Sequence, residues 1–358
     1  MPEGGPPVHI FEMTPDSLRE WCASRGLPGY RSKQILEWAY LQAATTFEQM
    51  ENLPAALRLD LASHFVLYES TVVSTQQSAD GMTKLLLRWR DGATSECVLI
   101  REGDRRTACL SSQVGCPVRC SFCASGMGGL ERQLTGGEIV EQAMRIRALC
   151  TEEAVDSRAS AVRLSHIVVM GIGEPLANYE AVLAALRAIH APWGLNIGAR
   201  KITISTVGLP KQIRRLADEG LQFNLALSLH AATDELRRRL IPWTERVNLL
   251  DLLAAARYYF EKTGREITLE YVMLRDVNTR AADLDRLVRL ARQLRCNVNL
   301  IPYNPVVGVE YHRPADAAME DFARRLRDRG VNAHVRWSRG LDIDAACGQL
   351  RRLLEVKE

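Results

Sequence analysis

The sequence lacks any long apolar run. No stretch of its 358 residues approaches the roughly 20 consecutive apolar residues of a membrane-spanning helix. The first seven residues, Met1–Pro7, lack the basic and apolar regions of a signal peptide. Internal repeats and low-complexity tracts are also missing. These features lead us to expect a cytoplasmic protein that makes no contact with a membrane.

An excess of charge of one sign is missing as well. The 46 basic and 43 acidic residues leave a net charge of +3, too small to indicate nucleic-acid binding by itself. A hydrophobic content of 47% and a charged content of 25% describe an ordinary globular protein. Arginines do gather locally, and each cluster fits either a solvated helix face or a phosphate-binding surface. These clusters are Arg105–Arg106, Arg237–Arg239, Arg324–Arg329 and Arg351–Arg352.

Cysteine, in contrast, is plentiful. The nine cysteines are an odd number in a chain without a secretory signal, which indicates a reducing compartment. Cys116, Cys120 and Cys123 follow a C-x3-C-x2-C spacing between a predicted strand and a predicted helix. Structural zinc sites normally close with four ligands, so three thiolates favour an iron–sulfur cluster. A [4Fe-4S] cube held by three cysteines has one iron left to bind a substrate.

From residue 107 onward, strand and helix patterns alternate. Such alternation implies right-handed crossovers and a parallel sheet. Six units are too few for a closed eight-stranded barrel, so we predict an α/β fold built on a partial (βα)6 barrel. The predicted strands are Thr107–Leu110, His166–Met170, Lys201–Ser205, Phe223–Leu229, Ile267–Met273 and Asn297–Ile301, with Val331–Trp337 as a late peripheral strand. The predicted helices are Gly136–Leu149, Tyr179–Ile189, Pro210–Asp218, Leu249–Lys262, Ala281–Leu294 and Ala315–Asp328.

The chain before residue 107 has a different pattern. Residues 1–66 predict a small helical accessory domain, with apolar residues at helical spacing around Ile35 and Trp38. Residues 67–106 predict a β-hairpin extension, because two strand patterns flank Asp91-Gly92. Residues 107–358 form the predicted barrel and a C-terminal loop. Within it, the polar stretch Thr151–Arg163 predicts an exposed insertion.

Polar residues follow the predicted barrel strands where each strand ends. The cysteine triplet follows the first strand and Gly171-Ile172-Gly173-Glu174-Pro175 the second. Ser205 ends the third strand, Ser228 and His230 end the fourth, and Asn304 follows the sixth. The carboxyl ends of parallel strands share one rim, where sites form in barrel folds. Each residue alone also fits a turn or a buried polar group, but their recurrence at five positions favours a site.

The cysteine spacing is the signature of radical S-adenosylmethionine (SAM) enzymes, and longer segments narrow the resemblance. Together they resemble the RlmN/Cfr family of radical SAM RNA methyltransferases, and Arg339-Gly340 with Asp342-Ile343-Asp344 is closer to the RlmN branch. Pro117-Val118-Arg119 and Gln133 depart from the family pattern and affect only local loop shape. The segments are Tyr30–Trp38, Cys109–Cys123, Met170–Pro175, Ile202–Thr206, Leu227–Ala231, Asn299–Pro305 and Asp342–Leu350.

The resemblance implies two cofactors, a [4Fe-4S] cluster on Cys116, Cys120 and Cys123, and SAM, two molecules per turnover. It also implies a set of SAM-binding residues. Glu174 is expected to accept from the SAM ammonium, and Ser205 to bond the amino-acid or ribose part. The full expected set is Gly173, Glu174, Ser205, Ser228, Leu229, His230 and Asn304.

The resemblance further implies methylation at C2 of an adenine in 23S rRNA and in a tRNA anticodon loop. Cys347 would carry the methyl group, and Cys109 would release the product by forming a disulfide with Cys347. An external electron donor and a thiol reductant complete the partners. The glutamate matching Glu96 is the family's proton acceptor, although its place in a predicted strand also fits a surface carboxylate. Cys22, Cys97, Cys150 and Cys296 are expected to be inert thiols.

Three alternatives stay open at this point. A Cfr-type reaction would methylate C8 of the same base. A protein of another class, an iron–sulfur electron carrier or redox sensor, would use Cys109 and Cys347 as a regulatory disulfide. A zinc-stabilised RNA-binding module is the third. The polar residues at the predicted rim weigh against a carrier, because electron transfer needs no ligand-binding groups around the cluster. No pattern in the sequence sets the oligomeric state.

Overall fold

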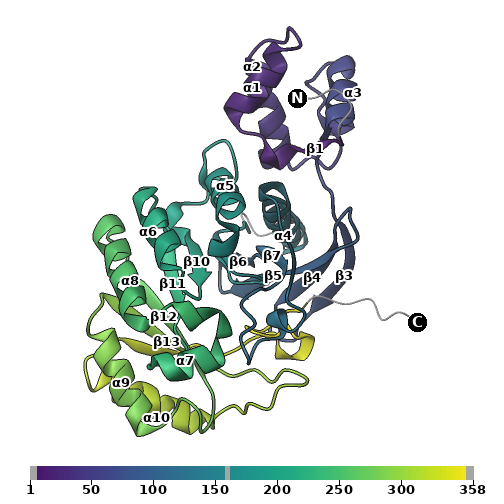
Figure 1. Ribbon diagram of the computed structural model, residues 1–358. Coiled ribbons are helices and arrows are strands. Elements are labelled where there is room, and N and C mark those ends of the chain that lie inside the picture. Colours follow the sequence, from purple (N-terminus) through teal and green to yellow (C-terminus); the bar gives the residue numbers. More distant parts are fainter. Residues whose placement is uncertain (1–5, 158–161, 352–358) are drawn as a thin grey trace.

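The structure is a computed structural model that describes residues 6–157 and 162–351. Residues 1–5, at the start of the expected accessory domain, lie outside the described residues. So do residues 352–358, at the end of the expected barrel domain, which include Arg352. A sheet of ten strands runs through the main body in the order β14-β13-β12-β11-β10-β9-β6-β5-β4-β3. Figure 1 shows helices along the outer side of this curved sheet and a small helical module at the N-terminal end.

Seven neighbouring strands of the sheet are parallel. They include all six predicted barrel strands, so the partial barrel is confirmed, and the seventh is the predicted peripheral strand at the sheet edge. Strong burial explains their apolar sequences, since helices cover one face and the barrel interior the other. The strands are β6 (Arg105–Cys109), β9 (His166–Val169), β10 (Ile202–Thr206), β11 (Asn224–Ser228), β12 (Ile267–Met273), β13 (Cys296–Pro302) and β14 (Ala333–Val335).

The predicted hairpin forms and continues the same sheet. Strands β4 (Thr83–Arg88) and β5 (Thr94–Glu102) are antiparallel, and β5 pairs in turn with β6 through Val98 opposite Cys109. A further strand, β3 (Thr71–Gln77), lies outside β4 and was not predicted. All of its residues are exposed, so it lacks the alternation of apolar and polar residues by which a strand is recognised.

Seven helices follow the barrel strands, and six were predicted. The exception is α7 (Asp234–Leu240), which is too short and too charged to show a clear apolar face. The predicted helix Gly136–Leu149 is too short, because α4 continues through Ser157 into the predicted insertion with no glycine or proline to end it. Residues 158–161 of that insertion lie outside the described residues. The helices are α4 (Gly136–Ser157), α5 (Tyr179–His190), α6 (Pro210–Asp218), α7, α8 (Leu249–Thr263), α9 (Ala281–Ala291) and α10 (Asp316–Arg327).

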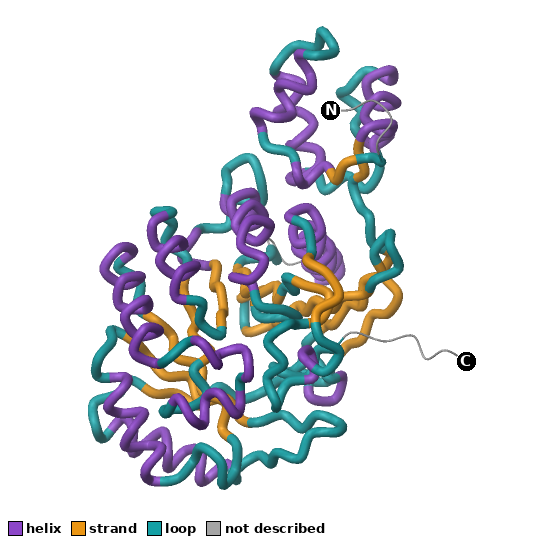
Figure 2. The backbone as a smooth tube through the Cα atoms, in the orientation of Figure 1, coloured by secondary structure: helices purple, strands orange, loops and turns teal. Residues whose placement is uncertain are grey.

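Helix α4 joins the barrel to the N-terminal module. Its first turn has the predicted capping box, in which Glu138 N donates to Thr135 Oγ1 at 3.2 Å and Thr135 N donates to Glu138 Oε2 at 2.8 Å. Farther along, Arg147 donates to the backbone carbonyls of Tyr40 and Leu41 at 2.5 and 2.7 Å. The module therefore rests against this helix (Figures 1 and 2).

The N-terminal module contains the expected helices. They are α1 (Pro15–Ala23), α2 (Tyr30–Leu36), which continues into a π-helical turn, and α3 (Ala55–His64), with the short parallel strands β1 (Val8–His9) and β2 (Phe65–Val66). Among the described residues, no helix is both long and apolar enough to cross a bilayer.

Candidate active site

The three cysteines of the triplet lie in a loop that a small ribbon closes. Strand β7 (Gln113–Gly115) pairs antiparallel with β8 (Leu130–Gln133). Gly115 has a φ of +75°, and a Cβ there would lie 2.0 Å from the carbonyl oxygen of Gly129, so only glycine permits this close approach. Gln133, a departure from the family pattern, accepts from Gln113 Nε2 at 2.9 Å, and Gln113 Oε1 accepts from Glu174 N at 2.7 Å. Gln133 thus supports the site from behind.

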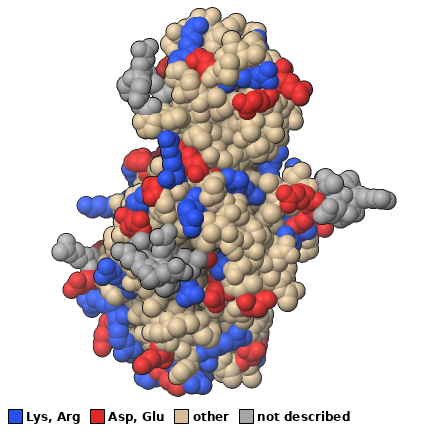
Figure 3. Space-filling view, turned by 90° about the vertical axis from the view of Figure 1, so that its right-hand side faces the viewer, with Lys and Arg blue, Asp and Glu red and all other residues tan. Residues whose placement is uncertain are grey.

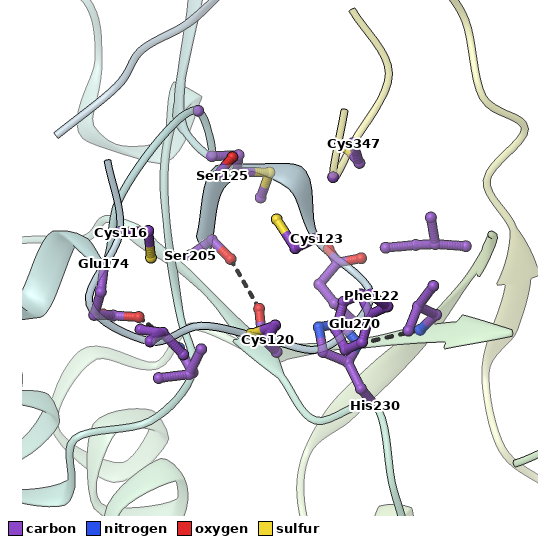
Figure 4. Close-up of a pocket in the computed structure, with 18 of the residues that line it drawn as sticks. Cys116, Cys120, Phe122, Cys123, Ser125, Glu174, Ser205, His230, Glu270 and Cys347 are labelled. Atoms are coloured by element: carbon purple, nitrogen blue, oxygen red, sulfur yellow. Dashed lines mark hydrogen bonds between the residues drawn. The ribbon is translucent and has the colours of Figure 1, made fainter. Parts of the chain in front are cut away.

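Cys116, Cys120 and Cys123 line one cavity. Figure 4 shows them around the same hollow, with Cys347 entering from the C-terminal segment. Burial raises the pKa of Cys116 to about 12 and raises those of Cys120 and Cys123. The thiols therefore stay neutral until a cationic centre displaces their protons. Among the described residues, no three Cys, His, Asp or Glu side chains lie ready to hold a single metal ion.

Glu174 lies beside the triplet at the end of β9. Its Oε1 accepts from Leu176 N at 3.0 Å and from Thr206 Oγ1 at 2.7 Å, while Oε2 accepts from Val207 N at 2.8 Å. Burial raises its pKa to about 7, although these hydrogen bonds favour the carboxylate. Since Oε2 has only one partner, it can accept one more hydrogen bond from a ligand.

The glycines before Glu174 have a structural role that the sequence did not reveal. A Cβ on Gly173, whose φ is +111°, would lie 2.7 Å from Ser112 Oγ and from Gln113 Cβ. A Cβ on Gly171 would lie 2.7 Å from Ser111 Oγ. Both glycines line the cavity, but their missing side chains make room for the segment after β6 and not for a ligand.

Strands β10 and β11 contribute two serines to the rim. Ser205 Oγ and Ser228 Oγ lie 3.3 Å apart, and both residues line the cavity. His230 also lines it, and its Nδ1 accepts from Val272 N at 3.1 Å. Burial lowers the pKa of His230 to about 3, so the ring is neutral. Leu229 differs from these residues, because its side chain is fully buried in the main core and only its backbone can contact a ligand.

Asn304, which follows β13, connects the cavity to the C-terminal loop. Its Nδ2 donates to the carbonyl of Cys347 at 2.9 Å, while its Oδ1 is buried and has no partner among the described residues. The loop also meets the triplet loop, since Ala124 N donates to Gly348 O at 2.8 Å and Ser125 Oγ donates to Leu350 O at 2.6 Å. These bonds hold Cys347 next to the cysteine triplet.

Cys347 lies on the border between two cavities. It lines the first one and also a second, with about 1490 Å³ of empty space, which Cys109 lines as well. Cys109 is buried at the end of β6, and burial raises its pKa to about 12. Cys347 is exposed, but toward the cavities, so the surrounding protein still raises its pKa, which the nearby Arg336 lowers in part. The structure therefore brings the two outer cysteines together, and both are free thiols.

Sequence reasoning missed two charged residues of the site. Glu270 on β12 lines the first cavity, and its Oε2 is buried without a partner among the described residues. Arg336, just after β14, lines both cavities. Burial disfavours the Arg336 cation, but the charges of Cys347, Glu270 and Cys109 outweigh it and raise its pKa. A single carboxylate inside the otherwise apolar strand β12 was the available signal for Glu270.

Glu96 lies on β5 and lines neither cavity. It is 4% exposed, so the interpretation as a surface carboxylate is wrong. Its Oε1 pairs with Lys84 Nζ at 2.9 Å, and its Oε2 accepts from Arg351 N at 2.8 Å. Burial raises its pKa, although Lys84 opposes this effect. Glu96 thus holds the end of the C-terminal loop.

The arginine clusters are largely engaged within the protein. Arg237 is 1% exposed, so it fits neither of the two predicted interpretations, a solvated helix face or a phosphate-binding surface. Arg106 pairs with Glu153 at 2.9 Å, and Arg329 pairs with Asp285 at 2.5 Å. Figure 3 shows basic and acidic residues interspersed over the face that it presents. Many arginines of these clusters are therefore engaged in ion pairs within the protein.

The other four cysteines keep the expected inert character. Cys22, Cys97 and Cys150 are buried and Cys296 is half-buried, and burial raises the pKa of each. A buried thiol with a raised pKa is a poor nucleophile.

The first cavity fits a cluster that also holds an amino-acid ligand. Three soft thiols line it, which suits iron and sulfide. The unpartnered oxygens of Asn304 and Glu270 and the free lone pair of Glu174 offer acceptors to an ammonium and to hydroxyl groups. Buried acceptors without partners are rare in folded proteins, so they indicate a bound polar ligand.

Comparisons with known proteins give the same assignment. Residues 110–291 match the model of the radical SAM superfamily, and residues 8–67 match that of the ribosomal RNA large subunit methyltransferase N-terminal domain. Two relatives named probable dual-specificity RNA methyltransferase RlmN, from Rhodopirellula baltica and Geobacillus kaustophilus, are each 45% identical. The alignments cover 96% and 98% of this chain, and 91% and 94% of theirs.

The structural comparison agrees. A crystal structure of a radical SAM methyltransferase from Sphaerobacter thermophilus superposes with a TM-score of 0.91 at 46% identity, covering 96% of this chain and 99% of that one. A radical SAM domain implies both SAM and a [4Fe-4S] cluster. The near-complete coverage of the relatives extends the assignment to the accessory module and the C-terminal loop. The chain therefore belongs to the RlmN family of radical SAM dual-specificity RNA methyltransferases.

Proposed function

We propose that this protein methylates C2 of an adenine in 23S rRNA and in a tRNA anticodon loop, by way of S-methylcysteine at Cys347 and a transient disulfide with Cys109. One observation carries the proposal, namely that Cys347 lines two cavities. The first contains the cysteine triplet and Glu174, and the second contains Cys109. A methyl group on Cys347 would therefore lie between the SAM site and the site of the base.

Different residues of the first cavity would bind the cluster and SAM. Cys116, Cys120 and Cys123 would hold the cluster as thiolates. Glu174 and Asn304 would accept from the SAM ammonium, and Ser205 with Ser228 would bond its carboxylate or ribose. We propose Glu270 as a further acceptor, because its Oε2 has no partner among the described residues. The neutral ring of His230 adds no positive charge beside the SAM sulfonium.

Cys347 begins the reaction as a nucleophile. Its thiol loses a proton, and the thiolate takes the methyl group of a first SAM, with S-adenosylhomocysteine as the leaving group. Arg336 favours the thiolate because its charge lowers the pKa of Cys347. The adenine carbon C2 is not nucleophilic, which explains why the methyl group passes first to sulfur.

The radical stage uses Cys347 as the carrier and Cys109 as the resolving thiol. When bound on Cys116, Cys120 and Cys123, the cluster would supply, together with a second SAM, the radical chemistry that removes a hydrogen atom from the methyl group on Cys347. The resulting methylene carbon would add to C2, and the adduct would then give the C2 proton to a general base and its unpaired electron to a one-electron acceptor. Cys109 thiolate attacks the Cys347 sulfur, and the released carbon takes a proton to become the methyl group. An external thiol reductant then reopens the disulfide.

Glu96 remains our proposed acceptor of the C2 proton. Its raised pKa favours proton uptake. In the described conformation its two oxygens are occupied by Lys84 and by the backbone of Arg351. Arg351 follows the Cys347 loop, so movement of that loop on RNA binding would release Glu96 toward the base.

The second cavity is the proposed site of the adenine. The base must leave its stack to reach Cys347, which favours single-stranded loops as substrates. Trp337 lines this cavity and is 44% exposed, so it can stack on a base. Arg336 and Arg339 line the same cavity and suit the phosphates beside that base. The choice of C2 over C8 follows from the resemblance of residues 338–344 to the RlmN branch.

The proposal is tested by product analysis. The protein is reconstituted anaerobically with iron and sulfide and incubated with SAM, a reductant and RNA, and the RNA is digested to nucleosides. We expect 2-methyladenosine, with none from Cys347→Ala as the matched control. A product that is mainly 8-methyladenosine would overturn the position, and no methylated base from a fully loaded protein would overturn the activity.

A further inference from the structure

Helix α7, which was not predicted, packs against the loop that contains Cys116, Cys120 and Cys123. Thr233 Oγ1 caps its start by accepting from Leu236 N at 3.3 Å. At its end, the carbonyl of Leu240 accepts from Ser121 N at 2.9 Å and from Ser121 Oγ at 3.4 Å. Ser121 follows Cys120 directly, so α7 is tied to the chain beside a proposed cluster ligand.

Arg237 lies on α7 one turn before Leu240 and is the largest fully buried side chain described. Its Nη2 donates to the carbonyl of Val207 and, at 3.5 Å, to that of Ser228. Its Nε and Nη1 are buried and have no hydrogen-bond partner among the described residues. A buried guanidinium with unused donors is strongly unfavourable unless an anion compensates it.

No carboxylate of the described residues supplies that anion. Asp234 on the same helix accepts from Leu249 N at 2.8 Å. Glu174 accepts from Leu176, Thr206 and Val207. Neither forms an ion pair with Arg237, and only the more distant charges of Cys120, Asp234 and Glu174 favour its cation. Burial lowers the pKa of Arg237 to about 10, which still leaves it charged at neutral pH.

We propose that Arg237 is a positioning residue for the iron–sulfur cluster, whose buried positive charge beside Cys120 compensates the thiolate-bound cluster and raises its reduction potential. This inference rests on the proposed placement of the cluster on the triplet. Val207, whose carbonyl accepts from Arg237, belongs to the buried cluster against which Cys120 packs, and sulfur atoms can accept N–H bonds. Charge and hydrogen bonds near the sulfurs are among the factors that set the potential of such clusters.

The direction of the effect follows from charge. One-electron reduction by an external donor adds one negative charge to the cluster, so a fixed cation nearby stabilises the reduced form more than the oxidised form. Burial strengthens the effect, because little water lies between the two charges. Arg237 also donates to the carbonyls of Val207, just after β10, and of Ser228, at the end of β11. These bonds fix its position relative to Val207, whose N–H donates to Glu174.

The helix provides matched controls. Arg238 and Arg239 follow Arg237 and are both exposed, so neither should influence the cluster. The midpoint potential is measured by anaerobic titration of the reconstituted full-length protein, with the reduced cluster followed by electron paramagnetic resonance. We expect Arg237→Gln and Arg237→Met to lower the equilibrium constant for reduction at least tenfold, which is about 59 mV for a one-electron couple. Arg237→Lys should stay near the parent value, and Arg238→Gln and Arg239→Gln should equal it.

The outcomes separate this inference from the proposed function. A parent protein that binds no cluster on the triplet would overturn both. A parent protein with a full cluster, together with unchanged potentials in Arg237→Gln and Arg237→Met, would overturn only the role of Arg237. An equal change of potential in Arg237→Lys would also overturn it, because charge would not then be the cause. If circular dichroism shows that neither neutral variant folds, Arg237 is a structural residue and the inference fails.

Discussion

The two sets of cysteines in this protein are built in opposite ways. Cys116, Cys120 and Cys123 lie within one short loop, and a local ribbon closes that loop. Cys109 and Cys347 come from opposite ends of the barrel domain and meet only because the C-terminal loop bonds to Asn304, Ala124 and Ser125. A local set can form as soon as its loop forms, whereas the outer pair depends on the finished fold. The geometry of the outer pair therefore depends on the contacts of the C-terminal loop.

The largest expected effect separates the triplet from every other cysteine. Changing Cys116, Cys120 or Cys123 to Ala should abolish bound iron and SAM cleavage together, because a cube on two protein ligands is not retained. Iron and sulfide analysis and detection of 5′-deoxyadenosine measure the two losses. Cys150→Ala is the control, since Cys150 is buried and lines neither cavity. A triplet variant with a full cluster and SAM cleavage would refute the ligand assignment.

The next prediction divides the outer pair itself. Cys347→Ala should keep the cluster but form no adduct with RNA, because the methyl carrier is gone. Cys109→Ala should accumulate a covalent protein–RNA adduct, because the carrier remains and the resolving thiol is lost. Denaturing gel electrophoresis with labelled RNA distinguishes the two variants. Identical behaviour, with no adduct from either, would contradict the assigned roles.

A smaller effect is expected from Arg336, the cation next to the outer cysteines Cys109 and Cys347. Arg336→Gln removes the cation that lowers the pKa of Cys347, so that pKa should rise. At any fixed pH below the pKa, the thiolate fraction and the rate of Cys347 methylation should then fall, by about tenfold if the pKa rises by about one. Mass spectrometry of the protein at several pH values should show the whole profile moved to higher pH.

Arg339→Gln is the matched control for Arg336→Gln. Arg339 also lines the second cavity, but its charge is not among the main influences on the pKa of Cys347. Its profile should therefore coincide with that of the parent protein. A uniform loss of rate in Arg336→Gln, without a displacement along the pH axis, would contradict the electrostatic explanation.

The smallest expected effect concerns the second cavity alone. Trp337→Ala should weaken RNA binding by about 1 kcal/mol, roughly fivefold, through the loss of one stacking surface. SAM cleavage without RNA should stay unchanged, since Trp337 does not line the first cavity. Trp243→Ala is the control, because Trp243 is 40% exposed but lines neither cavity. Equal losses in both variants would remove Trp337 from the RNA site.

Much of the architecture follows from patterns that are local in the sequence. The capping box of Thr135 and Glu138 starts α4 as expected, and Asp91-Gly92 turns the hairpin. The alternation of strands and helices suffices for the partial barrel, because parallel strands joined by helices have few ways to pack. The cysteine spacing, together with the rim residues, then predicts a candidate site, and the structure places these residues around one cavity. In each case the interacting residues are close in the chain, or the strand ends are brought to one rim by topology alone.

The remaining features depend on contacts between distant segments. Arg237 is part of an arginine-rich run that resembles a solvated surface, and only the packing of α7 under the triplet loop buries it. Glu96 resembles a surface carboxylate until Lys84 and the C-terminal loop cover it. Burial and charge pairing are properties of a three-dimensional environment, and they change the pKa and the partners of a side chain without changing its neighbours in sequence. For that reason the proposed cluster ligands can be predicted from their spacing, whereas the buried charged groups near them could be found only in the fold.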